Sequence, residues 1–315
     1  MLIFVYMKLN KELFEYSINN KEDIVDYEYA FIERNPELSI YVEKIKQLKK
    51  NLITISTLEK KFKNDDKKNI YVNAIIKNIQ SDWNEYINSS EFGCFVNACD
   101  NTRDTVVKDF ESLKVIISLY IDHRDIDLLT PNNWVQAILD GNSSRRKGGS
   151  ATNKLTKKLK KYNYIEVQDW DELINNKLSF GVCTTGKFNL KILRDNLNIR
   201  IETKSQEKNL DFVIKHNENY FLLEAKHINV SGGAQDKQIK ELIGLISLTE
   251  NNKKVSYLSF MDGKYSNELL LHNQSKRSKK KYNQLKEINI NINKTNNFWL
   301  NTKGFDKFLE KLNGK

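Results

Sequence analysis

The spacing of apolar residues changes partway along this chain of 315 residues, and the change restricts the folds that the chain can adopt. Before residue 140 the apolar side chains recur every three or four positions, which places them on one face of a helix. After residue 199 they instead alternate with polar residues or form short β-branched and aromatic runs, which favour strands. The sequence therefore predicts a mostly helical N-terminal region followed by a region that mixes strands and helices.

Three helices are expected in the N-terminal region. The first begins at Asn35 followed by Pro36, a pair typical of a helix start. The helix opened by Thr130–Pro131 should end at Gly141. The apolar stripes of the first two helices consist of Leu38, Val42, Ile45, Leu48 and Leu52, and of Phe110, Leu113, Ile117 and Tyr120.

A basic segment separates the two regions. Residues 142–161 contain eight Lys and Arg side chains and no acid. Residues 141–149 are too rich in glycine for a helix, whereas Leu155 and Leu159 resume a helical period. A basic loop that leads into a helix can hold phosphate groups; the alternative is a solvated linker. We place the domain boundary here, with residues 1–141 as the helical region and residues 142–315 as the second domain.

The second domain is expected to be of the α/β (α+β) class, with a mixed central β-sheet flanked by helices. A helix carrying Ile239, Leu242, Ile243 and Ile246 separates the last two predicted strands. The alternation of Ile and Asn over residues 288–293 predicts a further strand or strand edge, and Thr302 is expected to cap a final helix. The predicted strands span residues 199–203, 211–215, 220–227 and 255–260.

The charge balance favours a polyanionic partner. Lys and Arg number 51 against 41 Asp and Glu, which gives a net charge of +10; a solvated basic surface is the alternative. No apolar run is long enough to cross a bilayer, and residues 1–7 lack the features of a signal peptide, so no membrane association is expected. The three cysteines match no zinc spacing, and we expect free thiols in a reducing cytoplasm.

The most informative stretch is a predicted β-hairpin over residues 210–227. With its turn at residues 217–219 centred on Glu218, position 211 pairs with position 225. Alternation then places Glu224 and Lys226 on one strand face, diagonally adjacent to Asp211. The opposite face, with Phe221, Leu223 and Ala225, is expected to pack against the helix that carries Ile239 and Leu242.

Two carboxylates and one ammonium group within reach of each other suit metal-assisted phosphodiester hydrolysis. Mg²⁺ prefers oxygen ligands and keeps several waters, so Asp211, Glu224 and the Ala225 carbonyl would suffice as protein ligands. Lys226 is suited to orient the attacking water and to stabilise charge on the phosphate. A solvated hairpin face is the alternative interpretation, because E-x-K also occurs by chance in a lysine-rich chain.

Asp211, followed after twelve residues by Glu224-Ala225-Lys226, resembles the PD-(D/E)xK nuclease superfamily, especially type II restriction endonucleases. The glycine-rich turn and helix after the hairpin also resemble the family, and the resemblance covers about residues 145–262. It implies a restriction-endonuclease-like core, Mg²⁺ as cofactor, and products with 5′-phosphate and 3′-hydroxyl ends. The resemblance also implies that Gln235 or Gln238 would lie near the bound phosphate. Asn153 stands nearest to the place of a glutamate that many members carry, and Glu202 is a possible substitute.

The resemblance also implies partners. These are double-stranded DNA, a second copy of the chain in a homodimer, and a cognate DNA methyltransferase as genetic partner. The helical region would then serve DNA recognition, dimerisation or both. A repair or junction-resolving nuclease on the same fold and a catalytically inactive DNA-binding module are the alternatives. The side chains expected to contact DNA are Arg145, Arg146, Lys147, Lys154, Lys276 and Arg277.

Overall fold

The computed structural model describes residues 2–30, 32–62, 67–83, 85–141, 150–183, 186–201, 209–271 and 278–314. The chain forms two compact units, one of Met1–Ala30 with Gly148–Lys315 and one of Phe31–Lys147. The predicted boundary is therefore wrong at its N-terminal side. Helix α1 (Leu2–Asn19) contacts α15 (Lys279–Lys294), β6 (Phe298–Leu300) and α16 (Thr302–Leu312), so it belongs to the unit that holds the sheet.

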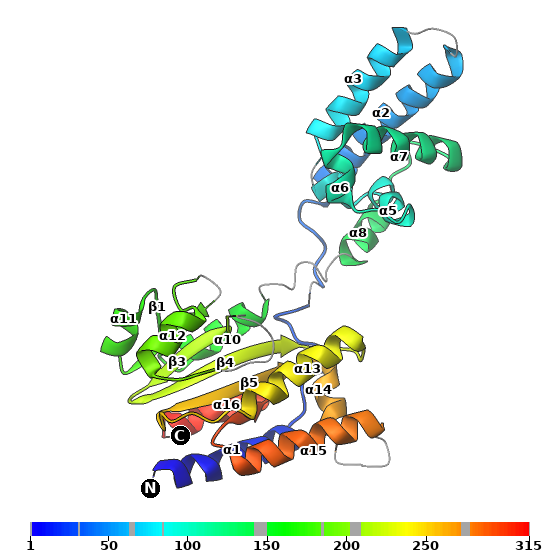
Figure 1. The fold of residues 1–315 in the computed structure, drawn as a ribbon. Helices are drawn as coiled ribbons and strands as arrows, with labels where there is room; N and C mark the ends of the chain where they lie inside the picture. The colour runs from blue at the N-terminus through cyan, green and yellow to red at the C-terminus, as the bar shows by residue number, and fades with distance from the viewer. Residues whose placement is uncertain are drawn as a thin grey trace. The chain divides into compact units, whose positions relative to one another are not determined.

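The larger unit is built on one mixed six-stranded sheet (Figure 1). Its strands lie in sequence order: β1 (Ile165–Val167), β2 (Leu178–Val182), β3 (Phe212–His216), β4 (Asn219–His227), β5 (Val255–Asp262) and β6. Strands β2, β3 and β4 form an antiparallel meander, while β1 runs parallel to β2, and β5 and β6 run parallel to β4. This arrangement confirms the α/β class with a mixed sheet.

Helices cover both faces of this sheet (Figure 1). Helices α1, α10 (Ser150–Lys161) and α16 pack against the face that carries Phe212, Phe221 and Leu223. Helices α12 (Leu190–Leu197) and α13 (Gly233–Ile246) pack against the opposite face, which carries Leu222 and Met261. The sheet is thus buried on both sides. For this reason its strands consist of runs of apolar residues and do not alternate regularly between apolar and polar residues. Among its described residues this unit also contains α11 (Trp170–Asn175) and α14 (Lys264–Leu269).

The smaller unit is helical, as predicted. The expected stripe on α2 is buried from Leu38 to Leu52, and it packs against α3, α7 and α8. Helix α2 begins two residues later than predicted, because Asn35 Oδ1 accepts a hydrogen bond from the Glu37 N–H (2.8 Å) and closes a turn before the helix. The helices are α2 (Leu38–Lys61), α3 (Lys67–Ser81), α4 (Glu85–Asn88), α5 (Glu91–Ala98), α6 (Arg103–Lys108), α7 (Phe110–His123) and α8 (Asn132–Gly141).

Several local predictions for the larger unit are wrong. The Ile and Asn alternation of residues 288–293 lies in α15, where Ile288 and Ile292 are buried one turn apart and Ile290 is exposed. Residues 199–201 are not in a strand, and the rest of that predicted strand lies outside the described residues. Asn301 caps the final helix through Gly304 N–H, and Thr302 is its first residue. Strands β1, β2 and β6 were not predicted.

Lys154, which the sequence predicts as a DNA contact, is buried instead. Its side chain is 4% exposed, and its Nζ lies 2.5 Å from Asp26 Oδ2 and 2.7 Å from Asp262 Oδ2. It also donates a hydrogen bond to Thr302 Oγ1 (2.7 Å), and His227 Nδ1 lies 2.9 Å from the other oxygen of Asp262. This placement corrects the prediction, because no nucleic acid can reach the Lys154 ammonium group.

Burial alone would raise the pKa of the Asp262 carboxyl, but the His227 hydrogen bond and the Lys154 charge outweigh it, so this pKa is lowered. A carboxyl with a lowered pKa stabilises the fold above its ordinary pKa, and this contribution is lost as the pH falls through the folded-state value. The ion pair of Lys154 and Asp262 therefore stabilises the fold at neutral pH, and this contribution is lost in acid.

We expect Lys154→Met to lower the free energy of unfolding at pH 7 by about 3–5 kcal/mol, because it leaves Asp262 as a buried charge without its ammonium partner. The deficit should shrink as the pH falls, because Asp262 can then be protonated. Urea unfolding measures both effects. Lys157→Met is the matched control: Lys157 is 67% exposed and pairs with Glu28, so its loss should cost at most about 1 kcal/mol. Equal costs for the two variants would contradict this account.

Candidate functional site

The hairpin of β3 and β4 forms with a register one residue away from the predicted one. His216 pairs with Asn219 and Phe212 pairs with Leu223, so the turn consists of two residues rather than three. Continued by one position, this register sets Asp211 opposite Glu224, whereas the prediction set it opposite Ala225. Residues directly opposite each other in an antiparallel pair share a face. The predicted register would have set Asp211 on the face of Ala225, away from Glu224, so it is the observed register, and not the predicted one, that puts the two carboxylates on one face.

The carboxylates lie on the sheet face that α12 and α13 cover. Alternation along β3 and β4 puts Asp211 on the face of Val213, and Glu224 and Lys226 on the face of Leu222. The prediction that α13 packs against the other face is wrong. That face, with Phe221, Leu223 and Ala225, packs against α10 and α16. Helix α13 therefore lies on the same side of the sheet as the candidate site.

Short polar contacts join Asp211 to the main chain of β4 and Lys226 to Glu224. The Ala225 N–H donates a hydrogen bond to Asp211 Oδ2 (2.7 Å), so the carboxylate of one strand is fixed by the main chain of the next. Lys226 Nζ forms an ion pair with Glu224 Oε1. The Glu224 and Lys226 side chains are only 8% and 11% exposed, so this ion pair is shielded from water.

Cys183 lies beside Asp211 at the start of β3. It follows β2, it is completely buried, and its N–H donates a hydrogen bond to the Asp211 carbonyl (2.9 Å). Burial raises the pKa of its thiol, and the charges of Asp211 and Glu224 raise this pKa further. The charges of both carboxylates therefore act on the pKa of the same thiol. The sequence contained no signal for this neighbour, because a lone cysteine far from the hairpin is ordinarily a core residue.

Two helices begin at this edge of the sheet. The first N–H of α12, at Leu190, donates to Asn209 Oδ1 (3.1 Å), two residues before Asp211. Helix α13 begins at Gly233, six residues after the end of β4, and carries Gln235 in its first turn as predicted. A Cβ on Gly232 would lie 2.5 Å from Gln235 Oε1, so the glycine leaves room for this amide. Gln238, one turn further along, is partly buried.

Among the remaining predicted residues, Asn153 does not join the site. Asn153 is exposed on α10, which packs on the opposite face of the sheet from Asp211 and Glu224. The other predicted residues lie outside the described ranges: Glu202, Arg145, Arg146, Lys147, Lys276 and Arg277.

The donor set of the site consists of hard oxygen atoms. Two carboxylates and the Ala225 main-chain carbonyl suit Mg²⁺, which binds few protein oxygens and retains waters. Among the residues that the structure describes, no three His, Cys, Asp or Glu side chains gather as a metal site. Two carboxylates and one carbonyl are a donor set of the kind that Mg²⁺ takes, whereas a structural zinc site takes four protein ligands, mostly Cys and His.

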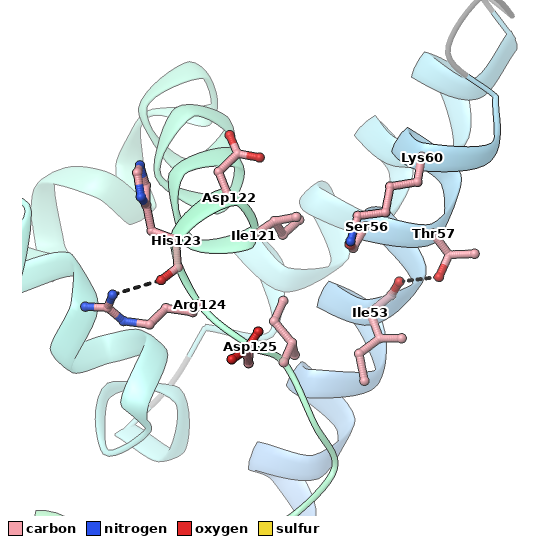
Figure 2. A pocket seen from close by; sticks show the side chains of 10 residues that line it. Ile53, Ser56, Thr57, Lys60, Ile121, Asp122, His123, Arg124 and Asp125 are labelled. Atoms are coloured by element: carbon pink, nitrogen blue, oxygen red, sulfur yellow. Dashed lines mark hydrogen bonds between the residues drawn. The ribbon is translucent and has the colours of Figure 1, made fainter.

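The helical unit contains a separate cavity of about 810 Å³ (Figure 2). Figure 2 shows that its lining comes from α2, including Ser56 and Lys60, and from the end of α7, including Asp122 and His123. The lining mixes both signs of charge. His123 is exposed at the last residue of α7, as expected for a solvated helix end.

A comparison with protein-family models, curated protein sequences and solved structures finds no significant match to this chain. In the described part of the chain, none of the helices has the length and apolar character needed to cross a membrane.

We expect the protein to bind one Mn²⁺ or Mg²⁺ ion through Asp211 and Glu224. Asp211→Asn and Glu224→Gln should each weaken binding by at least about tenfold, because each removes one anionic ligand. Isothermal titration calorimetry measures the affinity. Glu218→Gln is the control, because Glu218 lies in the turn of the same hairpin, is 79% exposed and pairs with Lys254. Unchanged affinity in both site variants would place the cation elsewhere.

Proposed function

We propose that this chain is a Mg²⁺-dependent, sequence-specific endonuclease of double-stranded DNA, of the PD-(D/E)xK type found in type II restriction systems. The observation that carries the proposal is the convergence of Asp211 and Glu224 from adjacent strands, with Lys226 paired to Glu224 on the same face. The order of elements supports it: an Asp directly before one strand, E-x-K within the next, and an amphipathic helix directly after.

Each residue of the site has a distinct role in this proposal. Asp211, Glu224 and the Ala225 carbonyl hold the cation. A divalent cation bound there supplies Lewis-acid polarisation of the scissile phosphate and makes a water molecule more acidic. The Ala225 N–H keeps the Asp211 carboxylate in place through its 2.7 Å hydrogen bond. Lys226 orients the attacking water and stabilises the charge that grows on the phosphate oxygens.

The reaction also requires a surface that binds the DNA backbone. The net charge of +10 supplies long-range attraction, and the N-termini of α12 and α13 at the site edge favour an anionic ligand. The predicted contacts to the DNA backbone are Arg145, Arg146, Lys147, Lys276 and Arg277. Lys154 is buried and is not one of them. Cleavage of both strands at a palindromic target would require a homodimer, with a cognate methyltransferase protecting host DNA.

Incubation with unmethylated phage DNA tests this proposal. With Mg²⁺ we expect discrete bands, and with a chelator no cleavage. Ca²⁺ should support binding without turnover, because it fits an oxygen site but holds a looser geometry. A smear would indicate a nuclease without sequence preference, as for a repair enzyme. Intact DNA bound by the protein in Mg²⁺ would contradict catalysis and leave a binding module.

Lys226→Met should lower the cleavage rate by about 10²–10³-fold, the usual cost of losing one group that stabilises transition-state charge. DNA affinity should change little, because a lysine that is 11% exposed and paired with Glu224 contributes little to phosphate binding. Single-turnover cleavage and fluorescence anisotropy separate the two quantities. Lys254→Met is the control, because Lys254 is 58% exposed and pairs with Glu218 beside the same hairpin. A full cleavage rate in Lys226→Met would exclude the proposed role.

A further inference from the structure

Helix α15 begins with three consecutive lysines. Its first turn consists of Lys279, Lys280 and Lys281, and the preceding Ser278 caps the helix by accepting a hydrogen bond from the Lys281 N–H (3.3 Å). The unpaired N–H groups at the start of a helix carry partial positive charge, so cationic side chains are unfavourable there. A sequence that breaks such a local preference is typical of a functional site. We call Lys279, Lys280 and Lys281 the lysine turn.

The lysine turn belongs to a helix on the same face of the sheet as Lys226. In the register of β4 and β5, Lys226 pairs with Met261, and paired residues of neighbouring strands share a face. Met261 packs in one buried cluster with Ile239 of α13 and Ile288 of α15. Helices α13 and α15 therefore both cover the face that carries Glu224 and Lys226.

The lysine turn also lies at the edge of the sheet where β4 ends. Helices α13 and α15 run side by side in the same direction (Figure 1). An ion pair between Lys280 and Asp236 joins their first turns, and Thr295 Oγ1 donates a hydrogen bond to the Ile246 carbonyl (3.2 Å) at their other ends. Because α13 begins in the loop that follows β4, both helices begin at the edge where Lys226 lies.

The spacing of these elements suits a DNA strand that crosses the candidate site. Packed helices lie about 8–10 Å apart, and the nucleotides of one strand follow each other about every 3.4 Å along the duplex axis. A strand that passes over the start of α13 therefore reaches the start of α15 within a few nucleotides.

A buried amide without a partner is directed at the lysine turn. Gln284 is 5% exposed, and neither Nε2 nor Oε1 of its side chain has a hydrogen-bond partner among the described residues. It lies one helical turn after Lys280, and helical side chains tilt toward the N-terminus over the preceding turn. A buried amide that makes no hydrogen bond is costly and rare in folded proteins. The Gln284 amide is therefore suited to donate to a ligand at the lysine turn.

The charges at the two adjacent helix starts favour an anion. The acids that the lysine turn contacts are Asp236, which pairs with Lys280, and Glu268, which pairs with Lys281 (2.5 Å). The two helix N-termini add partial positive charge. The first eight residues of α13 and of α15 contain one acid, Asp236, and six lysines: Lys237, Lys240, Lys279, Lys280, Lys281 and Lys286.

We propose that the lysine turn and the Gln284 amide bind a phosphate group of the DNA backbone a few nucleotides from the scissile phosphate. This inference rests on the proposed nuclease function. Lys279 and Lys280 pair with the phosphate oxygens, the N–H groups at the start of α15 donate to them, and Gln284 Nε2 donates a further hydrogen bond. Contacts to phosphate groups position a duplex without reading its bases. The lysine turn therefore sets the position of the strand relative to Asp211 and Glu224.

The first test is the affinity of the full-length protein for a fluorescein-labelled mixed-sequence duplex in Ca²⁺, measured by anisotropy at several KCl concentrations. Lys279→Gln combined with Lys280→Gln should bind about 3- to 10-fold more weakly, as expected for two exposed ion pairs. The slope of log affinity against log salt should become shallower by about 0.9, the value for one lost phosphate contact.

The matched control is Lys253→Gln combined with Lys294→Gln. This variant removes the same charge from two exposed lysines at the opposite edge of the sheet, one just before β5 and one at the end of α15. It should keep the affinity and the salt slope of the wild type.

The second test is Gln284→Met, which separates a role in binding from a role in packing. Methionine has a similar length but cannot donate a hydrogen bond, and it removes two buried polar atoms that have no partner. The urea midpoint of the free protein should therefore rise, while DNA affinity should fall about tenfold. A glutamine that only supports the fold would give the opposite result, with a lower urea midpoint and unchanged affinity.

Equal affinities and salt slopes in the lysine-turn variant and its control would overturn the phosphate proposal but not the nuclease proposal, provided that the wild type still cleaves. A wild type that neither binds nor cleaves DNA would overturn both, and this outcome is visible without any variant. Inorganic phosphate supplies the last distinction. If phosphate stabilises the wild type against urea but not the lysine-turn variant, and DNA affinity is unchanged, the turn binds a free anion and the DNA proposal is wrong.

Discussion

The hydrogen bond from the Ala225 N–H to the Asp211 carboxylate depends on the register of β3 and β4, and so does the whole candidate site. Strand β3 is buried along all five residues and is paired on both sides, by β2 and by β4. A slip by one residue would move Phe212 and Ile214 to the face that α12 and α13 cover, and Val213 to the face that α10 and α16 cover. Both packed layers would have to rearrange, so the register is strongly specified. The same constraint keeps Asp211 opposite Glu224, so the packing of the sheet sets the two carboxylates on one face.

The hairpin and its three polar residues could be predicted from the sequence, but the register could not. The prediction centred the turn on Glu218, whereas the structure closes it with two residues, and Asn217 has a left-handed backbone (φ 54°). Asparagine tolerates that conformation, so the turn had a local signal that the symmetric three-residue interpretation overlooked. The predicted position of α13 failed for a related reason. Both faces of the sheet are apolar, so alternation alone did not show which face this helix covers.

Long-range contacts explain the other failures. Lys154 belongs to a run of lysines that looks solvated, yet its partners Asp26 and Asp262 lie 128 and 108 residues away in the sequence. Nothing in the local pattern distinguishes it from Lys157 or Lys160. Helix α1 likewise joins the sheet through contacts with α16 and β6 at the other end of the chain. Tertiary structure decides whether such residues are buried, and the periodicity of a single sequence does not predict it.

The sheet edge at the end of β4 carries polar groups on both of its faces. Lys226 faces the carboxylate side with Glu224, while the next residue, His227, faces Asp262, Lys154 and Tyr29. The second cluster anchors the segment that follows α1 to the sheet through Asp26 and Tyr29. Two consecutive residues of β4 therefore serve two separate clusters on opposite faces of the sheet.

The most direct test of the central claim is anomalous diffraction from a crystal soaked with Mn²⁺. The account predicts one peak within about 2.0–2.2 Å of an oxygen from both Asp211 and Glu224, the distance expected for a small divalent cation, with Lys226 released from its ion pair to face the same space. A peak at any other residues, or a Glu224 that stays paired with Lys226 at saturating Mn²⁺, would contradict it.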